Sequence, residues 1–275
     1  MHADPELKSA ATLLRERLGG LRPETGIILG SGLGNLGDRI DNPVVVPFIE
    51  IPGFPVTTAI GHKGNFICGT VGGKCVIAAQ GRYHYYEAHT YETVTLPLRL
   101  MIELGIRTLI TTNASGALNP EYDLGDLMVL TSHINFLEGY RENNYRTENC
   151  SMYDESLRKE FIETAENLGI EIREGCYVAT TGPSYETPAE HFNFTRMGGD
   201  AIGMSTIPEV QEANTAGLRT LGISIVADAP HYEEDPTTSC LVRTGDMIDG
   251  EEVVKIAEES ANRLMDIIEE MLKRQ

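Results

Sequence analysis

The run Thr25-Gly-Ile-Ile-Leu-Gly-Ser-Gly-Leu-Gly34 is the stretch of this sequence that indicates the fold most directly. Its first five residues form a short apolar segment closed by glycines, which is typical of a buried strand that ends in a tight turn. Two further strand-like segments, 64–71 and 74–80, follow and are separated by Gly72-Gly73. We therefore expect this part of the chain to supply neighbouring strands of one sheet.

Helical and strand-like segments alternate through the rest of the chain. Helices are predicted before strands in three pairs: 91–104 before 107–112, 154–168 before 176–181, and 207–217 before 219–227. Amphipathic spacing predicts two further helices, 5–19 near the N-terminus and 250–273 near the C-terminus. This alternation predicts an α/β fold, a single domain over residues 1–275 with a central mixed, mostly parallel β-sheet flanked by helices.

Composition excludes several classes of protein. The 275 residues carry 22 Lys+Arg against 41 Asp+Glu, a net charge of −19, so a nucleic-acid partner is not expected. No segment has the ~18 uninterrupted apolar residues of a membrane helix, and the charged N-terminal segment lacks the apolar core of a signal peptide. The 5 cysteines are widely spaced and form no CxxC pair, which favours reduced thiols and a cytoplasmic location.

The glycine loop 30–37 (GSGLGNLG) is open to three interpretations. Gly32, Gly34 and Gly37 match the dinucleotide fingerprint, but too few residues precede Asp41-Asn42-Pro43 for the helix that the fingerprint requires. A tight turn with no ligand is a second possibility. The third is a small-anion site made of backbone N–H groups and the Ser31 hydroxyl.

Polar or glycine-rich residues follow each predicted strand, where ligands bind in open α/β sheets. Besides the glycine loop they are 80–84 (QGRYH), 113–116 (NASG), 182–186 (GPSYE) and 227–228 (AD). Arg82, His84 and Tyr86 alternate in sequence, so their side chains should share one side. Alone, Arg82 would be a surface ion pair and His84 a structural histidine; together with the glycine loop they favour a phosphate site.

Other catalytic chemistry finds little support. The 7 histidines form no HxH, HxxxH or HExxH pattern, so no bound metal is expected, and there is no GxSxG elbow. Glu186 and Asp228 are carboxylates at strand ends. Glu186 could equally occupy the N-terminal turn of a helix that begins near Pro188, and Met204 could be core packing.

Taken together, these motifs resemble the trimeric purine nucleoside phosphorylase family, which includes the methylthioadenosine phosphorylases. The resemblance covers nearly the whole chain. It rests on GIILGSGLG (26–34), GHKGN (61–65), QGRYHYYE (80–87), TTNASGALNP (111–120), GDLMVLTSHIN (125–135), TGPSYETPAE (181–190) and DAIGMSTIPEV (200–210).

The resemblance implies a reversible phosphorolysis of purine ribo- and 2′-deoxyribonucleosides to the free base and the pentose 1-phosphate. It implies residue roles as follows: phosphate binding by Ser31, His62, Arg82, His84, the backbone of Ala114, and Ser205; ribose binding by Tyr86 and Met204; base binding by Tyr185, Glu186 and Asp228; catalysis by His84, Glu186 and Asp228. Inorganic phosphate is a co-substrate, and no cofactor is implied.

The resemblance also implies a homotrimer in which a neighbouring subunit lends an aromatic residue to the site. The segment that would supply it, 135–153, looks shortened, and both Tyr140 and Tyr145 are candidates. The reaction needs no metal: a bound phosphate dianion stabilises positive charge on the ribose and then captures C1′, and a donor at N7 stabilises the leaving purine.

Two positions depart from the family pattern. Where Asp228 stands, 6-oxopurine enzymes usually carry an amide-bearing residue. An ionised Asp228 would repel O6 of inosine or guanosine, whereas Glu186 suits the N1–H of these bases. Either Asp228 is protonated in the complex, as burial can arrange for a carboxyl group, or the specificity is broader than usual.

The second departure is Gly250, where a histidine usually faces the 5′-hydroxyl, preceded here by extra residues in the loop 229–249. A roomier 5′ pocket follows, which keeps methylthioadenosine or adenosine phosphorylase as an alternative. A protein that binds nucleosides without turnover is an alternative from another class. We expect 6-oxopurine nucleosides to be the substrates.

Overall fold

The computed structural model describes residues 5–137, 152–234, 241–244 and 249–274. Its helices are α1 (Pro5–Arg17), α2 (Tyr91–Val94), α3 (Leu96–Leu104), α4 (Glu155–Asn167), α5 (Pro188–Arg196), α6 (Ile207–Thr215) and α7 (Gly250–Arg274). Its strands are β1 (Thr25–Leu29), β2 (Asp41–Pro47), β3 (Asn65–Val71), β4 (Lys74–Gln80), β5 (Thr108–Ala117), β6 (Leu127–Phe136), β7 (Ile172–Thr180), β8 (Ala201–Gly203), β9 (Arg219–Asp228), β10 (His231–Glu234) and β11 (Leu241–Thr244). The 3-10 turns are η1 (Gly34–Arg39), η2 (Phe48–Glu50) and η3 (Tyr85–Glu87).

Nine strands form one sheet in the order β2-β3-β4-β1-β5-β8-β7-β6-β9. Because β9 also pairs with β5, the last five strands close into a ring, from which β1 to β4 extend as an open half. Strands β1, β4, β5 and β9 run parallel, whereas β2 with β3 and β6 with β9 run antiparallel. The predicted α/β fold with a mixed sheet flanked by helices is confirmed.

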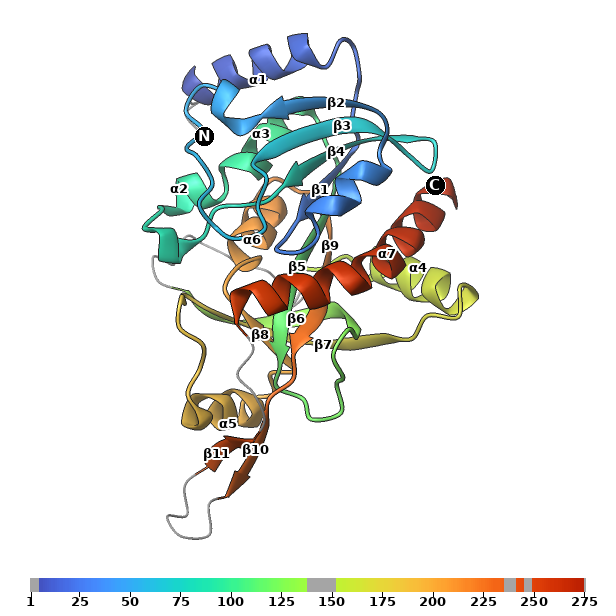
Figure 1. Cartoon of the computed structure of the whole chain (residues 1–275). Helices are drawn as coiled ribbons and strands as arrows, with labels where there is room; N and C mark the ends of the chain where they lie inside the picture. The colour runs from blue at the N-terminus through green and yellow to red at the C-terminus, as the bar shows by residue number, and fades with distance from the viewer. Residues whose placement is uncertain (1–4, 138–151, 235–240, 245–248, 275) are drawn as a thin grey trace.

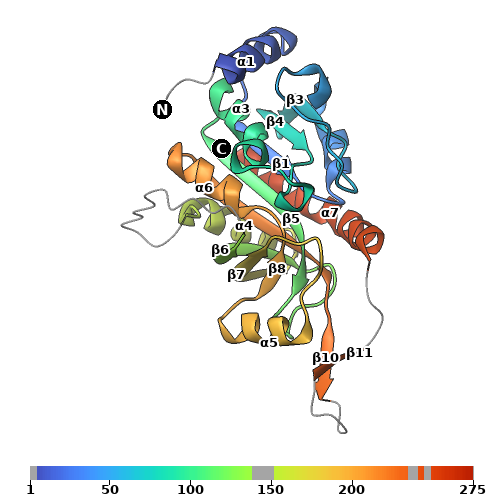
Figure 2. The ribbon, with the colours of Figure 1, turned by 90° about the vertical axis from the view of Figure 1, so that its left-hand side faces the viewer.

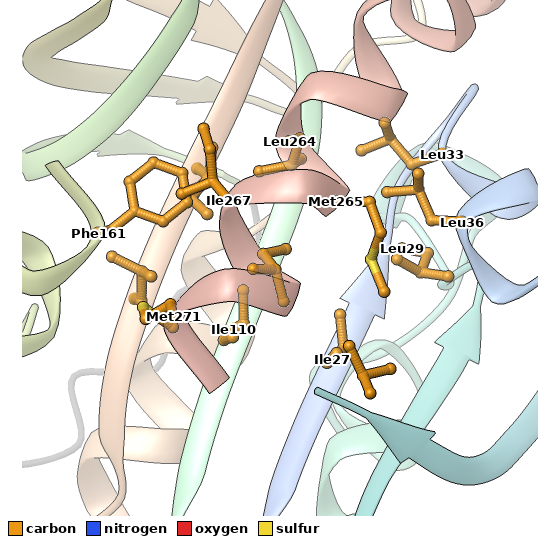
Figure 3. Close-up of a cluster of buried hydrophobic side chains, with 14 of the residues drawn as sticks. Ile27, Leu29, Leu33, Leu36, Ile110, Phe161, Leu264, Met265, Ile267 and Met271 are labelled. Atoms are coloured by element: carbon orange, nitrogen blue, oxygen red, sulfur yellow. The ribbon is translucent and has the colours of Figure 1, made fainter. Parts of the chain in front are cut away.

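Helices cover both faces of the sheet. Figure 2 shows α6 and α7 on opposite sides of β5, and both helices contact β9. Successive residues of β1 point to opposite faces of the sheet, and each face carries a hydrophobic cluster. In the first cluster, Ile27 and Leu29 pack with α7 and α4; in the second, Ile28 packs with α1 and α3. Figure 3 shows the first cluster, in which Leu264, Met265 and Ile267 of α7 meet Ile110 of β5 and Phe161 of α4. This packing fixes β1, β5 and β9 relative to one another.

The structure corrects several predicted boundaries. The predicted helix 91–104 is two helices, α2 and α3. Pro97 lies in the first turn of α3, where a proline is tolerated because the N–H it lacks has no partner there; within one continuous helix, the same proline would break the hydrogen-bond pattern. The strand predicted at 107–112 continues to Ala117, so residues 113–116 lie within β5 and not in a loop after it. A register shift between Ser115 and Gly116 lets this end of β5 pair with both β9 and β8.

Some elements were not predicted at all: β2, β6, β8 and the hairpin β10–β11; helix α5 was considered only through its start near Pro188. The hairpin falls within the extra loop 229–249, and Figure 1 shows it projecting beside α5. The end helices match their predictions within a few residues: α1 spans Pro5–Arg17 and α7 spans Gly250–Arg274. Among the residues that the structure describes, no helix is long and apolar enough to cross a membrane.

Candidate active site

The ends of β1, β4, β5 and β9 surround a cavity of about 540 Å³. Every residue that sequence analysis assigned to the site lines this cavity except His62, which lies directly behind Ser31. The assigned lining residues are Ser31, Arg82, His84, Tyr86, Ala114, Tyr185, Glu186, Met204, Ser205 and Asp228. Motifs up to about two hundred residues apart therefore meet in one place, as expected for strand ends on one side of a sheet.

The glycine loop ends against the first turns of α7. Gly32 has a φ of +76°, and a Cβ there would lie 2.5 Å from the carbonyl oxygen of Val254, so only glycine fits. After the loop comes only the short turn η1, without the helix that dinucleotide binding requires. The loop instead places the Ser31 hydroxyl 3.2 Å from Nε2 of His62.

Arg82 is not a surface residue but is buried, with 2% of its area exposed. Its Nε donates to Oε1 of Glu209 at 2.7 Å and its Nη2 donates to Oε2 at 3.1 Å, a fork-to-fork ion pair. Nη2 also donates to the carbonyl of Thr112 at 2.7 Å, and Nη1 donates to the Ser205 hydroxyl at 3.1 Å. Nη1, which makes one bond among those described, is thus the nitrogen left for an anion in the cavity.

Ser205 is held by an unusual backbone at the start of α6. Thr206, its neighbour, has a φ of +71°, which is rare for a residue with a Cβ. Asn113 of β5 donates from Nδ2 to the Thr206 hydroxyl at 2.9 Å, and Ser224 of β9 donates to Oδ1 of Asn113 at 2.6 Å. The network stabilises a strained turn, as is common where a side chain must be aimed into a site.

Three rings stack beside this network: His62 on His84 with centroids 5.1 Å apart, and His84 on Tyr86 at 4.6 Å. Burial, followed by the nearby charges of His84 and Arg82, lowers the pKa of His62 to about 3. Burial also lowers the pKa of His84, against the opposing effect of its hydrogen bond with Glu87. Burial raises the pKa of Tyr86 to about 12.

Glu87 received no role from the sequence, yet it fixes His84. Its Oε2 accepts from the backbone N–H of His84 at 2.8 Å and lies 3.3 Å from Nδ1 of the ring, while Oε1 accepts from Thr58. Burial opposes ionisation of Glu87, but these hydrogen bonds outweigh it and lower its pKa to about 2. Because their pKa values are lowered, the imidazoles of His62 and His84 are neutral near pH 7. This end of the cavity therefore offers hydrogen bonds more than net positive charge.

The other end of the cavity carries Tyr185, Glu186 and Asp228. The suggestion that Glu186 caps a helix is not confirmed: Thr187 is the N-cap of α5, and Glu190 completes the capping box. Glu186 precedes the cap with its side chain 11% exposed, and Asp228 ends β9 and is buried. Met204 is half-buried at the cavity wall, so it is not part of the core.

Gly250 is the first residue of α7 and lines the cavity together with Ile60, Val253 and Val254. Tyr140 and Tyr145 lie outside the described residues. Within the described residues, no three His, Cys, Asp or Glu side chains are grouped as a metal site would require. Sequence analysis assigned no role to Glu209 and Glu87; the only available signal was their place inside the motifs 200–210 and 80–87.

Comparisons with known proteins agree with this arrangement. Residues 24–273 match the family described as the phosphorylase superfamily. The chain is 47% identical over 231 residues to purine nucleoside phosphorylase 1 of Bacillus subtilis (strain 168), covering 81% of this chain and 85% of that protein. It is 37% identical over 220 residues to the purine nucleoside phosphorylase of Rattus norvegicus, covering 75% and 76%.

Solved structures extend the likeness to the fold. Crystal structures of Schistosoma mansoni purine nucleoside phosphorylase in complex with adenosine and with inosine give TM-scores of 0.83 and 0.84 at 34% and 32% identity. Each covers 98% of this chain and 96% of the other. The similarity therefore extends over nearly the whole chain.

Proposed function

The chain belongs to the phosphorylase superfamily and, within it, to the purine nucleoside phosphorylases, and on that premise we propose that it prefers 6-oxopurine nucleosides such as inosine and guanosine. The products are the free base and ribose or 2′-deoxyribose 1-phosphate. One observation carries the proposal: a single cavity is lined both by hydrogen-bond donors, among them Ser31, Arg82 and Ser205, and by the two carboxyl groups of Glu186 and Asp228. A nucleoside between them would have its base at the carboxyl groups and its C1′ toward the donors.

Inorganic phosphate occupies the end with Ser31, Arg82, His84 and Ser205, together with the backbone of Ala114. Arg82 supplies the planar donor group, and Glu209 holds that group in position through two hydrogen bonds. His62 orients the Ser31 hydroxyl. Because these groups are already oriented in the free protein, little reorganisation is needed when the dianion binds.

Bond cleavage follows from this placement. As the C1′–N9 bond breaks, its electron pair moves to the purine and positive charge develops on the ribose, beside the phosphate. A phosphate oxygen then forms the new bond to C1′, while Tyr86 and Met204 keep the ribose in line. Glu186 accepts a hydrogen bond from N1–H, and a protonated Asp228 donates toward N7 and O6. No metal or organic cofactor takes part.

The test is a panel of inosine, guanosine, adenosine and methylthioadenosine, assayed for free base with and without phosphate. We expect phosphate-dependent cleavage of the first two, with pentose 1-phosphate formed in equal amount. Faster cleavage of adenosine would make Asp228 an ionised acceptor for the 6-amino group. Faster cleavage of methylthioadenosine would assign the apolar wall of Ile60, Val253 and Val254 to a 5′ substituent. Binding without cleavage would make the chain a nucleoside-binding protein.

We further propose that the chain forms a homotrimer. Phe136 at the end of β6 and Phe192 in α5 are 45% and 51% exposed, which supports burial of this region against a neighbouring subunit. Light scattering of the purified protein should give three times the mass of one chain. A monomeric mass at active concentrations would contradict the proposal.

A cytoplasmic location is the final part of the proposal. Cys68, Cys75 and Cys176, the cysteines that the structure describes, are all free thiols, as expected in a reducing compartment. Cell fractionation tests this directly.

A further inference from the structure

His191 of α5 lies beside the carboxylate that we place at the base. Its Nδ1 is 3.7 Å from Oε1 of Glu186, just beyond hydrogen-bond distance, and the two side chains are only 13% and 11% exposed. This nitrogen atom is buried and, within the described part of the chain, has no hydrogen-bond partner. A buried nitrogen without a partner is costly, and a shift of under one ångström by the carboxylate would satisfy it.

We propose that His191 is a positioning residue for recognition of the base: its Nδ1–H donates to Oε1 of Glu186 in the complex and leaves Oε2 to accept N1–H of a 6-oxopurine. This rests on the proposed function. A carboxylate that is closed off from water by the base must keep its charge to remain an acceptor, and a donated hydrogen bond favours the charged form. The cap of α5 cannot compete for Glu186, because Thr187 and Glu190 complete it by themselves.

The ring of Tyr232 packs against the imidazole of His191. Tyr232 belongs to β10, and its ring lies 4.4 Å from that of His191 with an interplanar angle of 47°. Strand β11 also contacts α5, and Figures 1 and 2 show the hairpin beside this helix. The extra segment 229–249 therefore has a role: through Tyr232 and His191 it supports the carboxylate that selects the base.

The experiment compares His191→Leu with His191→Asn, since the amide nitrogen of asparagine can take the place of Nδ1. For His191→Leu we expect kcat/KM for inosine to fall by about tenfold or more, as for the loss of a hydrogen bond to a charged group. The value for adenosine, which has no N1–H, and the KM for phosphate should stay unchanged. His191→Asn should restore most of the inosine rate.

A double-mutant cycle completes the test. In a Glu186→Gln background, His191→Leu should have no further effect on inosine, because the carboxylate that it supports is gone. Equal losses with inosine and adenosine, a raised KM for phosphate or failure of asparagine to restore the rate would each overturn the proposal in favour of a structural role. Failure of the proposed function looks different, because the unmodified chain would then cleave adenosine faster than inosine or would cleave neither nucleoside.

Discussion

The two ends of the cavity are built in different ways. At the phosphate end, Arg82 and Ser205 are buried and hydrogen-bonded to each other, and Arg82 also donates to β5 at Thr112 and to α6 at Glu209. At the base end, Tyr185 is 38% exposed, and His191 has a buried nitrogen with no partner among the described residues. The difference indicates that the end for the common co-substrate is fixed in advance, whereas the end for the variable base completes its contacts only when the base arrives.

The largest effect should come from breaking the fixed end at Glu209. Replacing Glu209 with leucine leaves the Arg82 guanidinium buried without its partner, which destabilises a protein by about 3–5 kcal/mol. We expect unfolding at lower denaturant concentration and a loss of turnover of at least ~100-fold. Denaturant titrations measure the change in stability, and initial rates measure the loss of turnover.

A matched control separates stability from function. Combining Glu209→Leu with Arg82→Met removes both charges, which is often neutral for stability. The double variant should recover most of the lost free energy of unfolding without recovering turnover. If Glu209→Leu alone unfolds like the unmodified protein, the phosphate end is not held by this ion pair.

At the adjustable end, Glu186→Ala should have the next largest effect. Removing the acceptor for N1–H should lower kcat/KM for inosine by about 100-fold, since a site built to hydrogen-bond its substrate discriminates strongly. The KM for phosphate and the free energy of unfolding should change little, in contrast to Glu209→Leu. Near-full activity on inosine would remove Glu186 from the base site.

Asp228→Asn should have a smaller effect that sharpens the contrast between the two ends. An amide donates to O6 and N7 whatever the pH, so we expect the ratio of inosine to adenosine cleavage to rise by about tenfold. Rates for both nucleosides with and without the substitution measure this ratio. An unchanged ratio would mean that Asp228 does not contact the base.

The same contrast decides how much of the site the sequence could predict. Ser31, Arg82 and His84 follow strands within continuous motifs, so the edge of an α/β sheet was enough to bring them together. Glu209 could not be predicted, because in the sequence it is an ordinary acidic residue in the first turn of a helix. Its partner, Arg82, is reached only in the folded protein: α6 packs against β5, and Arg82 is joined to β5 by its hydrogen bond to Thr112.

The fold was predicted in the same uneven way. Strand β1 and the end helices have clear apolar patterns, and they appear as expected. Strand β6 was missed because its buried first four residues give way to 131–135 (TSHIN), of which only Ile134 is apolar. The hairpin β10–β11 was missed because its first strand, 231–234, ends in two glutamates and has no alternating pattern. His191 acquires one of its neighbours, Tyr232, from this hairpin, so that contact was not predictable.

The smallest predicted effect tests whether the phosphate end is neutral before phosphate binds. Burial, with the charges of His84 and Arg82, holds the pKa of His62 at about 3 in the folded chain. The unfolded chain takes up the proton below about pH 6.5, so stability is lost as the pH falls through that value toward 3. His62→Gln removes this contribution. The drop in unfolding free energy from about pH 7.5 to about pH 6 should therefore be ~0.8 kcal/mol smaller in the variant than in the unmodified chain.

The control for this comparison is the interval from about pH 7.5 to about pH 9, where neither state takes up the proton and both proteins should change equally. His84 and His133, whose pKa values burial also lowers, are present in both proteins and cancel. If the two proteins lose stability equally down to about pH 6, His62 takes up its proton in the folded chain as readily as in the unfolded chain. The phosphate end would then gain positive charge below about pH 6.5, and at those pH values it would attract phosphate by charge as well as by hydrogen bonds.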